Sequence, residues 1–233
     1  MTPEQVLAVY DQAYADTYND QFLLCEAWKP KAEMEYEFLA GLLREGDSWL
    51  DVACGTGYFL SLFPQLERAG LDLSPAMLEV ARRSNPGVPF FTGDFRDPRP
   101  EWEGKWSLVT CMWYAYCLVE SVADVKRLVA NLAAWTSEGG RCFVPLFNPE
   151  KVCKIKIPYC NPDYFGGPFY ITGVTWTWIG PEGKVHENLV APQVEFMQEM
   201  FSEYFSKVEI VSYARNQPFP FKAILASQKK SSP

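Results

Sequence analysis

Three carboxylates at the ends of strand-like stretches are the residues of this chain best suited to bind a polar ligand. Asp51 lies in the apolar run 49–52, Asp72 ends the run 69–72, and Asp94 follows the run 90–92. In an open sheet of parallel strands, ligands bind beyond the carboxyl ends of the strands, where an acidic side chain hydrogen-bonds ribose hydroxyls. The three positions therefore predict a site for a ligand that carries a ribose.

Two glycines, Gly55 and Gly57, follow the first carboxylate, with Thr56 between them. Glycine allows a sharp backbone turn and lets a ligand lie against the backbone, because no Cβ intervenes. The third glycine of the dinucleotide-binding pattern is absent, so the spacing is a weak indication of a nicotinamide site. Asp51, four positions before the first glycine, favours a different ligand.

The stretches around these residues alternate between strand-like and helix-like patterns. Ser74 and Pro75 are typical of a helix start, as N-cap and first helical residue. Strands are predicted at 49–52, 69–73, 90–96, 106–114, 139–145, 207–214 and 221–227, and helices at 30–43, 58–67, 75–82 and 193–205. We therefore expect an α/β fold, with a Rossmann-like seven-stranded sheet and helices on both faces.

The two flanking regions differ in character from this core. Residues 3–24 form a helical pattern with Tyr10, Tyr14 and Tyr18 on one face, which either packs against the core or acts as a lid. The alternating run 174–178, followed by a turn at 180–183, predicts an antiparallel hairpin. We expect a single domain, which divides into a helical lid, a ligand-binding core, a substrate-capping flap and a final helix with strands, at 1–46, 47–147, 148–192 and 193–233.

Composition excludes several classes of function. The net charge of −8 argues against nucleic acid as a partner, because phosphate binding needs a basic surface. No run approaches the roughly 20 apolar residues of a membrane span, and the N-terminus shows no secretory signal. Seven cysteines without a C-x-x-C pair, together with one histidine, argue against a structural zinc site and suit a reducing cytoplasm. We expect a cytoplasmic protein without a metal, and a homodimer stays open.

The pattern D-x-x-x-G-x-G at 51–57, with acidic residues at 72 and 94, resembles the class I S-adenosylmethionine (SAM)-dependent methyltransferases. The stretches 50–82 and 106–121, the Tyr10-Asp11 pair and Tyr14 are similar to small-molecule members that methylate nucleotide-sugar amines or glycine. The resemblance implies SAM as cofactor and S-adenosylhomocysteine as product. It implies methyl transfer to a nitrogen or oxygen of a small-molecule metabolite.

The resemblance also implies roles for individual residues. Asp51 would lie near the amino group of the cofactor's methionine, Asp72 would hold its ribose hydroxyls, and Asp94 would accept from its adenine amino group. Leu73 and Met77 would pack on the adenine. The complete set implied for the cofactor is Asp51, Gly55, Thr56, Gly57, Asp72, Leu73, Met77, Asp94, Phe95 and Met112.

Methyl transfer from a sulfonium needs a base only when the acceptor must lose a proton. His186, the sole histidine, is the first candidate, because an ordinary pKa of about 6.5 suits this task; an exposed cross-strand residue is the competing interpretation. Tyr14 and Tyr114 are the alternatives for catalysis. Candidates for the wall of an acceptor pocket are Tyr10, Trp113, Tyr116, Trp176 and Trp178. Two other functions stay open: transfer of a different group, and a non-catalytic subunit that supports another chain.

Overall fold

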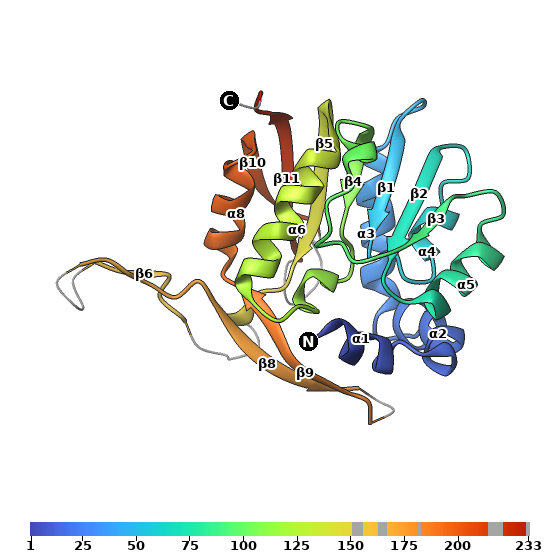
Figure 1. The fold of residues 1–233 in the computed structure, drawn as a ribbon, viewed down its shortest axis with the longest axis horizontal. Helices are drawn as coiled ribbons and strands as arrows, with labels where there is room; N and C mark the ends of the chain where they lie inside the picture. The colour runs from blue at the N-terminus through green and yellow to red at the C-terminus, as the bar shows by residue number, and fades with distance from the viewer. Residues whose placement is uncertain (151–155, 163–166, 181–182, 214–220, 232–233) are drawn as a thin grey trace.

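A seven-stranded sheet runs through the middle of the molecule (Figure 1), in a computed structural model that describes residues 1–150, 156–162, 167–180, 183–213 and 221–231. The strand order is β10-β11-β5-β4-β1-β2-β3. Strands β1 to β5 are parallel, and β11 is antiparallel to both of its neighbours, β5 and the edge strand β10. The strands are β1 (Ser48–Val52), β2 (Glu67–Asp72), β3 (Phe90–Thr92), β4 (Trp106–Thr110), β5 (Thr136–Leu146), β10 (Phe205–Ser212) and β11 (Lys222–Lys229). The expected α/β fold with a Rossmann-like sheet is confirmed.

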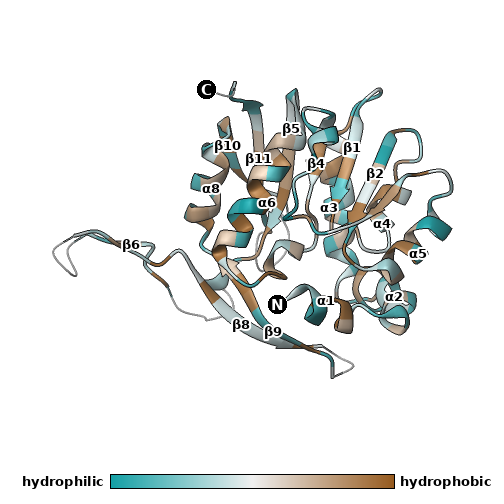
Figure 2. Ribbon diagram, viewed as in Figure 1, coloured by the Kyte–Doolittle hydropathy of each residue, from teal (hydrophilic) through white to brown (hydrophobic). Residues whose placement is uncertain are grey.

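Helices cover both faces of the sheet. Helices α6 (Val122–Trp135) and α8 (Val194–Ser202) pack on the face that carries Leu50 and Val52. Helices α3 (Lys29–Leu42), α4 (Tyr58–Ser61) and α5 (Pro75–Ser84) pack on the face that carries Trp49. Successive strand residues point to opposite faces, so one short strand supplies both cores. Figure 2 shows apolar residues gathered along the central strands, with hydrophilic residues frequent on outer helices such as α5.

The N-terminal helices and a hairpin meet beyond the sheet. Helices α1 (Pro3–Val9) and α2 (Gln12–Tyr18) and the π-helical turn η1 (Asn19–Leu23) precede α3, and the 3₁₀ turns η2 (Pro100–Trp102) and η3 (Ala115–Cys117) flank β4. Strands β8 (Gly173–Ile179) and β9 (Val185–Pro192) form a separate antiparallel pair that passes across the lower end of the sheet toward α1 (Figure 1). The predicted hairpin is present, although residues 181–182 of its turn lie outside the described residues.

Two sequence-based expectations about the elements are wrong. The helix predicted at 58–67 is only α4, which ends at Ser61, because Pro64 has no amide hydrogen and disfavours helical geometry at the residue before it. The strand predicted at 90–96 ends at Thr92, so Asp94 lies in the loop after β3. A short hairpin of β6 (Cys160–Asn161) and β7 (Phe169–Tyr170) was not predicted. The division into lid, core, flap and final segment stays a prediction.

Candidate functional site

The turn after β1 places backbone rather than side chains at the carboxyl end of the sheet. Gly55 and Gly57 have φ angles of 55° and 66°, in the left-handed region that glycine adopts without strain. A Cβ on Gly57 would lie 2.9 Å from the Asn85 amide nitrogen, so this glycine also allows α5 to pack close to the turn. The Thr56 hydroxyl donates to the Asn19 side chain at 2.6 Å and ties the turn to η1.

Asp72, at the end of β2, joins this turn to the start of α5. Its carboxylate accepts hydrogen bonds from the Gly55 and Ser74 backbone nitrogens, both at 2.8 Å. Burial raises the pKa of Asp72 to about 6, against the effect of these backbone donors. Ser74 caps α5 and donates to the Tyr10 carbonyl at 2.7 Å, which holds the N-terminal segment against the same edge of the sheet. A ligand hydroxyl donating to Asp72 would favour its ionised form.

Asp51 is the most perturbed carboxylate of this region. It is 2% exposed and accepts a hydrogen bond of 2.6 Å from the Thr110 hydroxyl, which itself accepts from the Trp49 indole at 2.9 Å. Burial raises the pKa of Asp51 to about 7, and the neighbouring Asp72 adds to the effect. A cation placed beside Asp51 would favour its ionised form and lower this pKa.

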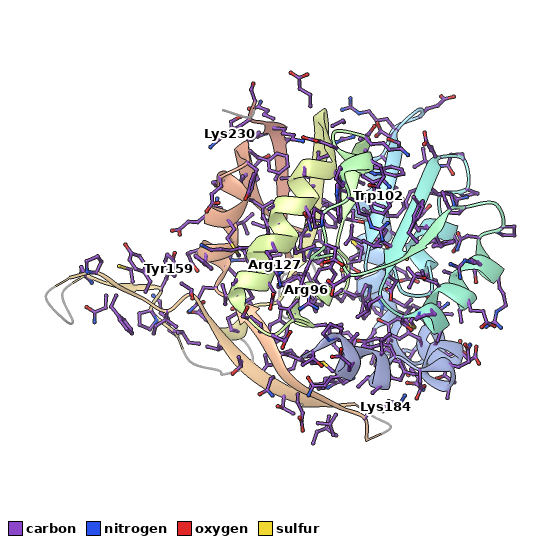
Figure 3. All side chains as sticks on the ribbon, in the orientation of Figure 1. Arg96, Trp102, Arg127, Tyr159, Lys184 and Lys230 are labelled. Carbon is purple, nitrogen blue, oxygen red and sulfur yellow. The ribbon has the colours of Figure 1, made fainter. Side chains whose placement is uncertain are left out.

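Asp94 has a partner that the sequence did not reveal. Arg96 donates its backbone nitrogen and its guanidinium to both carboxylate oxygens, at distances from 2.5 to 3.0 Å. This pairing lowers the pKa of Asp94 against the effect of burial, and Arg96 pairs further with Glu120 and Asp124. A ligand amino group could bind Asp94 only by sharing oxygens that Arg96 already occupies. Figure 3 shows Arg96 in the middle of the molecule, close to the lower end of α6.

A cavity of about 80 Å³ lies between the N-terminal segment and the ends of β1, β2 and β4. Seven of the ten residues expected to bind the cofactor line it, namely Gly55, Asp72, Leu73, Met77, Asp94, Phe95 and Met112. Asp51 and Thr56 line a neighbouring cavity of about 40 Å³ that shares Gly55 and Met112 with the first. Gly57 lines neither cavity, so its place in the turn is structural. Tyr18, which the sequence placed on the tyrosine face of the N-terminal segment, also lines the larger cavity, whereas sequence reasoning missed Ala53, Arg96 and Leu118 in its wall.

A third cavity, of about 220 Å³, has predominantly aromatic walls. Seven of the predicted acceptor and catalytic residues line it: Tyr10, Tyr14, Trp113, Tyr114, Trp176, Trp178 and His186. Its wall also contains Tyr18, Phe22, Trp28, Lys31 and Phe147. The lid, the loop after β4 and the hairpin β8–β9 thus each contribute rings to one pocket.

Tyr116 is the exception among the predicted acceptor residues, and this prediction is corrected. It is fully buried in η3, lines none of the three cavities, and its hydroxyl accepts from the Phe147 backbone nitrogen at 2.7 Å. Two residues earlier, Tyr114 has its ring in the aromatic cavity. The 3₁₀ turn carries the later tyrosine into the core, where its hydroxyl supports the end of β5.

Two residues, Tyr18 and Trp113, line all three cavities and therefore mark their junction. Trp113 and Tyr114 have φ angles of 52° and 62°, which cost bulky side chains roughly 1–2 kcal/mol each. Strain of this kind persists where the surrounding structure imposes it and is concentrated at functional sites. The strained loop directs one ring to the junction and the next into the aromatic cavity.

The tyrosines of the lid form a continuous series of ring contacts. Asp11 interrupts the helical pattern and caps α2 by accepting from the Tyr14 nitrogen at 2.9 Å. The ring centroids of Tyr10 and Tyr14 are 5.2 Å apart, and those of Tyr14 and Tyr18 are 5.8 Å apart. Burial raises the pKa of Tyr10 and of Tyr18, so these phenols stay protonated at neutral pH.

His186, in β9, is 2% exposed and lies among the rings of Tyr10, Tyr14 and Trp178. Its ring centroid is 4.7 Å from that of Trp178 and 5.9 Å from that of Tyr10. Burial, with a smaller effect of Lys184, lowers the pKa of His186 to about 4, so the imidazole is neutral at neutral pH. Its Nε2 atom has no hydrogen-bond partner within the described part of the chain. An imidazole of such low basicity is a poor base for removing a proton from the methyl acceptor. It is better suited to form a hydrogen bond with that molecule.

A buried ion pair adjoins the aromatic cavity, and sequence reasoning missed it. Lys31 and Glu35, one turn apart in α3, are 2% and 0% exposed and make a contact of 2.5 Å. The Tyr213 hydroxyl donates to Glu35 at 2.9 Å, while the Lys31 nitrogen lies 3.9 Å from the centre of the Trp113 ring. Burial lowers the pKa of Lys31, against the effect of Glu35. Pairs with this spacing are common on exposed helix faces, so the sequence alone carried no signal of burial.

The tip of the hairpin β8–β9 is hydrogen-bonded to the N-terminal segment. Lys184 donates to the Val9 carbonyl at 2.8 Å and to the Asp11 carboxylate at 3.0 Å. Figure 3 shows Lys184 at the far end of the hairpin, beside the N-terminal helices. On the other side of the lid, Asp16 and Arg83 form an ion pair of 2.9 Å. The N-terminal segment thus makes polar contacts with both the hairpin and α5.

Two further features of the described ranges bear on function. No helix among the described residues is long and apolar enough to cross a membrane. Within the same ranges, no group of three or more His, Cys, Asp or Glu side chains is placed to hold a metal ion.

Comparisons with known proteins identify methyltransferases as the proteins to which this chain is similar. The methyltransferase domain family matches residues 50–140. A dTDP-4-amino-2,3,4,6-tetradeoxy-D-glucose N,N-dimethyltransferase of Saccharopolyspora spinosa is 33% identical over 148 residues, which cover 62% of this chain and 59% of the relative. A dTDP-3-amino-3,4,6-trideoxy-alpha-D-glucopyranose N,N-dimethyltransferase of Streptomyces venezuelae is 35% identical over 149 residues, which cover 61% of each. The similarity thus spans about three fifths of these curated relatives.

Solved structures are similar over nearly the whole chain. The SAM-bound structure of an amino pentose methyltransferase from Micromonospora echinaspora has a TM-score of 0.62 at 22% identity and covers 94% of this chain and 98% of its own. A sugar N-methyltransferase from Streptoalloteichus has a TM-score of 0.60 at 20% identity and covers 84% of this chain and 87% of its own. At such identities the likeness shows the fold alone.

Proposed function

We propose that this chain, which is similar to the methyltransferase domain family over residues 50–140, is a class I SAM-dependent methyltransferase and transfers a methyl group from SAM to a nitrogen or oxygen of a small molecule. The observation that carries the proposal is the junction of three cavities at Tyr18 and Trp113. Two of these cavities bear the carboxylates and the glycine turn expected for the cofactor, and the third is aromatic. A donor and an acceptor bound in them would meet at the junction.

The residues present fit SAM as the cofactor. A Cβ at Gly55 would lie 3.1 Å from the Met77 side chain, so glycine keeps this edge of the cavity open. Asp72 borders the cavity and would accept from ribose hydroxyls, and Asp51 would accept from the cationic amino group of the methionine. The raised pKa of Asp51, about 7, is that of a buried carboxylate that gains from a neighbouring cation. Leu73, Phe95 and Met77 offer apolar contacts for the adenine.

SAM, when bound, supplies an activated methyl group, which the acceptor takes by in-line displacement of S-adenosylhomocysteine. The chain's contribution is to bring the two reactants together in the right orientation, which accounts for much of the acceleration of such a reaction. Tyr18 and Trp113 enclose the junction, and the lid and hairpin exclude water around it. The unpartnered Nε2 of His186 would orient the acceptor by a hydrogen bond. Tyr14 and Tyr114 would shape the pocket beside it.

The relatives suggest one class of acceptor. Two of them are named as N,N-dimethyltransferases of amino sugars carried on dTDP, which makes an amine nitrogen a candidate for the methylated atom. We further propose that the protein works in the cytoplasm, with neither nucleic acid nor membrane as partner. The net charge of −8 supports the first exclusion, and a homodimer is compatible with the proposal.

Methyl transfer is tested with methyl-deuterated SAM and a small-molecule extract of the native host, analysed by mass spectrometry. We expect a product that carries the deuterated methyl group, together with S-adenosylhomocysteine. A product that carries a different part of SAM would show that the protein transfers a group other than methyl. Binding of SAM without turnover on any acceptor would favour the non-catalytic subunit and contradict the proposed activity.

A further inference from the structure

The buried Lys31–Glu35 pair is the feature of the aromatic cavity that its ring contacts do not explain. Lys31 is the only Lys or Arg among the described residues that line this cavity. The same helix carries an exposed pair with the same spacing, Lys29 and Glu33, whose side chains are 56% and 60% exposed. Burying a lysine is costly unless its charge is compensated. Glu35 compensates it here, yet the pair borders an apolar pocket rather than solvent.

The ammonium of Lys31 also lies close to two aromatic rings. It lies 3.9 Å from the centre of the Trp113 ring and 4.8 Å from that of Tyr114. Glu35 accepts one hydrogen bond from it, while an ammonium has three hydrogens to donate. Lys31 lines the cavity, and Glu35 does not. The ammonium thus contacts both its carboxylate partner and the Trp113 ring, which itself lines the cavity.

Two indole N–H groups in the same wall lack a partner. The Nε1 atoms of Trp113 and Trp176 are buried, and neither finds a hydrogen-bond acceptor in the described ranges. Burying a donor without a partner is unfavourable, so a ligand oxygen that accepts from it binds more tightly. The cavity thus offers an ammonium and two N–H donors, with no Asp or Glu among its described lining residues. This inventory matches a ligand that brings acceptor oxygens.

The walls define the shape of such a ligand. Phe147 and Trp176 stack at 4.5 Å with their planes 4° apart, and Trp28 meets Trp113 edge to face at 6.2 Å. Flat rings of this number suit a flat, apolar body. A diphosphate would bring two negative charges to one ammonium that Glu35 already pairs, whereas a monoacid brings only one.

We propose that Lys31 is a specificity-determining residue that binds an acidic oxygen of a flat aromatic acceptor, so that this enzyme takes aromatic monoacids. The inference rests on the proposed methyltransferase function, and it assigns this chain a class of acceptor that differs from the dTDP-linked amino sugars for which the two relatives are named. Lys31 fixes the acid at one end, the indole N–H groups donate to its second oxygen or to a neighbouring one, and the aromatic body lies between the rings. Tyr18 and Trp113 then hold the acceptor against the junction.

The test compares binding of 2-naphthoate with binding of its neutral isostere 2-naphthamide, by calorimetry on the protein saturated with S-adenosylhomocysteine. A hydrogen bond to a charged group contributes about 1.5–3 kcal/mol, so we expect 2-naphthoate to bind at least about ten-fold more tightly. Lys31→Met alone would leave the charge of Glu35 buried without a cation, with only the Tyr213 hydroxyl as a partner, which destabilises folding. The variant is therefore the double substitution Lys31→Met with Glu35→Gln, which removes both charges.

The matched control is the exposed pair in the same helix, Lys29→Met with Glu33→Gln. We expect the buried double variant to lose the preference for 2-naphthoate, and the exposed one to keep it. Trp176→Phe keeps the stacked ring but removes its N–H, and we expect it to reduce affinity for 2-naphthoate more than affinity for 2-naphthamide, because a hydrogen bond to a charged acceptor is the stronger one.

Two results would overturn the assignment: equal binding of the two probes by the wild type, or a preference that survives in the buried double variant. The cofactor titration separates this failure from a wider one. If S-adenosylhomocysteine binds while the probes are not discriminated, only the acceptor class is wrong. If S-adenosylhomocysteine does not bind, the proposed function fails as well.

Discussion

The protonation of Asp51 provides a quantitative test of the cofactor site. With a pKa of about 7, its carboxyl is about 76% ionised at pH 7.5 and about 3% ionised at pH 5.5. If the cationic amino group of SAM binds the ionised form alone, its dissociation constant should rise about 25-fold between these two pH values. Asp72, with a pKa of about 6, should add about a four-fold effect in the same direction. Cofactor binding should release protons near pH 7.

The sign of the effect on stability is opposite. The pKa of Asp51 is higher in the folded protein than the ordinary value of 3.8, so the folded state binds more protons between pH 4 and pH 7. The free energy of unfolding of the cofactor-free protein should therefore fall as the pH rises through this range. Acid thus stabilises the empty protein against unfolding through Asp51 while it weakens the binding of SAM.

The assay is calorimetric titration of SAM at pH 5.5, 6.5 and 7.5, repeated in buffers of different ionisation enthalpy to count the protons released. Asp51→Asn should retain only the roughly four-fold pH effect of Asp72, and Thr110→Val should move the midpoint to higher pH, because the hydroxyl that favours the ionised form is lost. The exposed Asp97→Asn serves as control. A pH dependence in Asp51→Asn equal to that of the wild type would refute the assignment.

Three further substitutions test other parts of the site. Gly57→Ala should lower the melting temperature more than Gly46→Ala, because both have positive φ but only the first Cβ would meet neighbours; equal losses would show that close packing at the turn is unimportant. His186→Gln should lower the turnover number but not SAM affinity, and with its pKa near 4 His186 should contribute no titration to the rate between pH 6 and 8; unchanged turnover would remove it from the mechanism. Lys184→Met should raise the acceptor KM a few-fold by releasing the lid, an effect of about 1 kcal/mol. The exposed Lys207→Met should leave the KM unchanged, and a similar rise there would argue against a role of the hairpin tip.

The parts of the site that the sequence predicted are those fixed by strand ends. Asp51, Gly55 and Asp72 lie together because parallel strands bring their carboxyl ends to one edge of the sheet, a consequence of the fold class alone. The aromatic residues of the lid and hairpin were also found, because the spacing of the tyrosines and the alternation of Trp176 and Trp178 indicate a common face.

Contacts between distant elements carried no such signal. In the sequence, Lys31 and Glu35 have the spacing of an ordinary exposed helix pair. Only the packing of α3 against Trp113 and Tyr213 buries them. Tyr114 lines the aromatic cavity while Tyr116 is buried in the core, because the backbone between β4 and η3 is left-handed. No residue propensity predicts this conformation. The pairing of Arg96 with Asp94 was missed for a similar reason, since it depends on how the loop after β3 closes.

A crystal structure with S-adenosylhomocysteine bound would be the most direct test of the site. We expect the adenosine in the cavity beside Asp72 and Leu73, the amino group of the homocysteine beside Asp51, and the sulfur directed at the junction of Tyr18 and Trp113. The sulfur would then face the aromatic cavity in which the acceptor binds. Adenosine bound elsewhere, or a sulfur directed away from that cavity, would contradict the proposed methyl transfer across the junction.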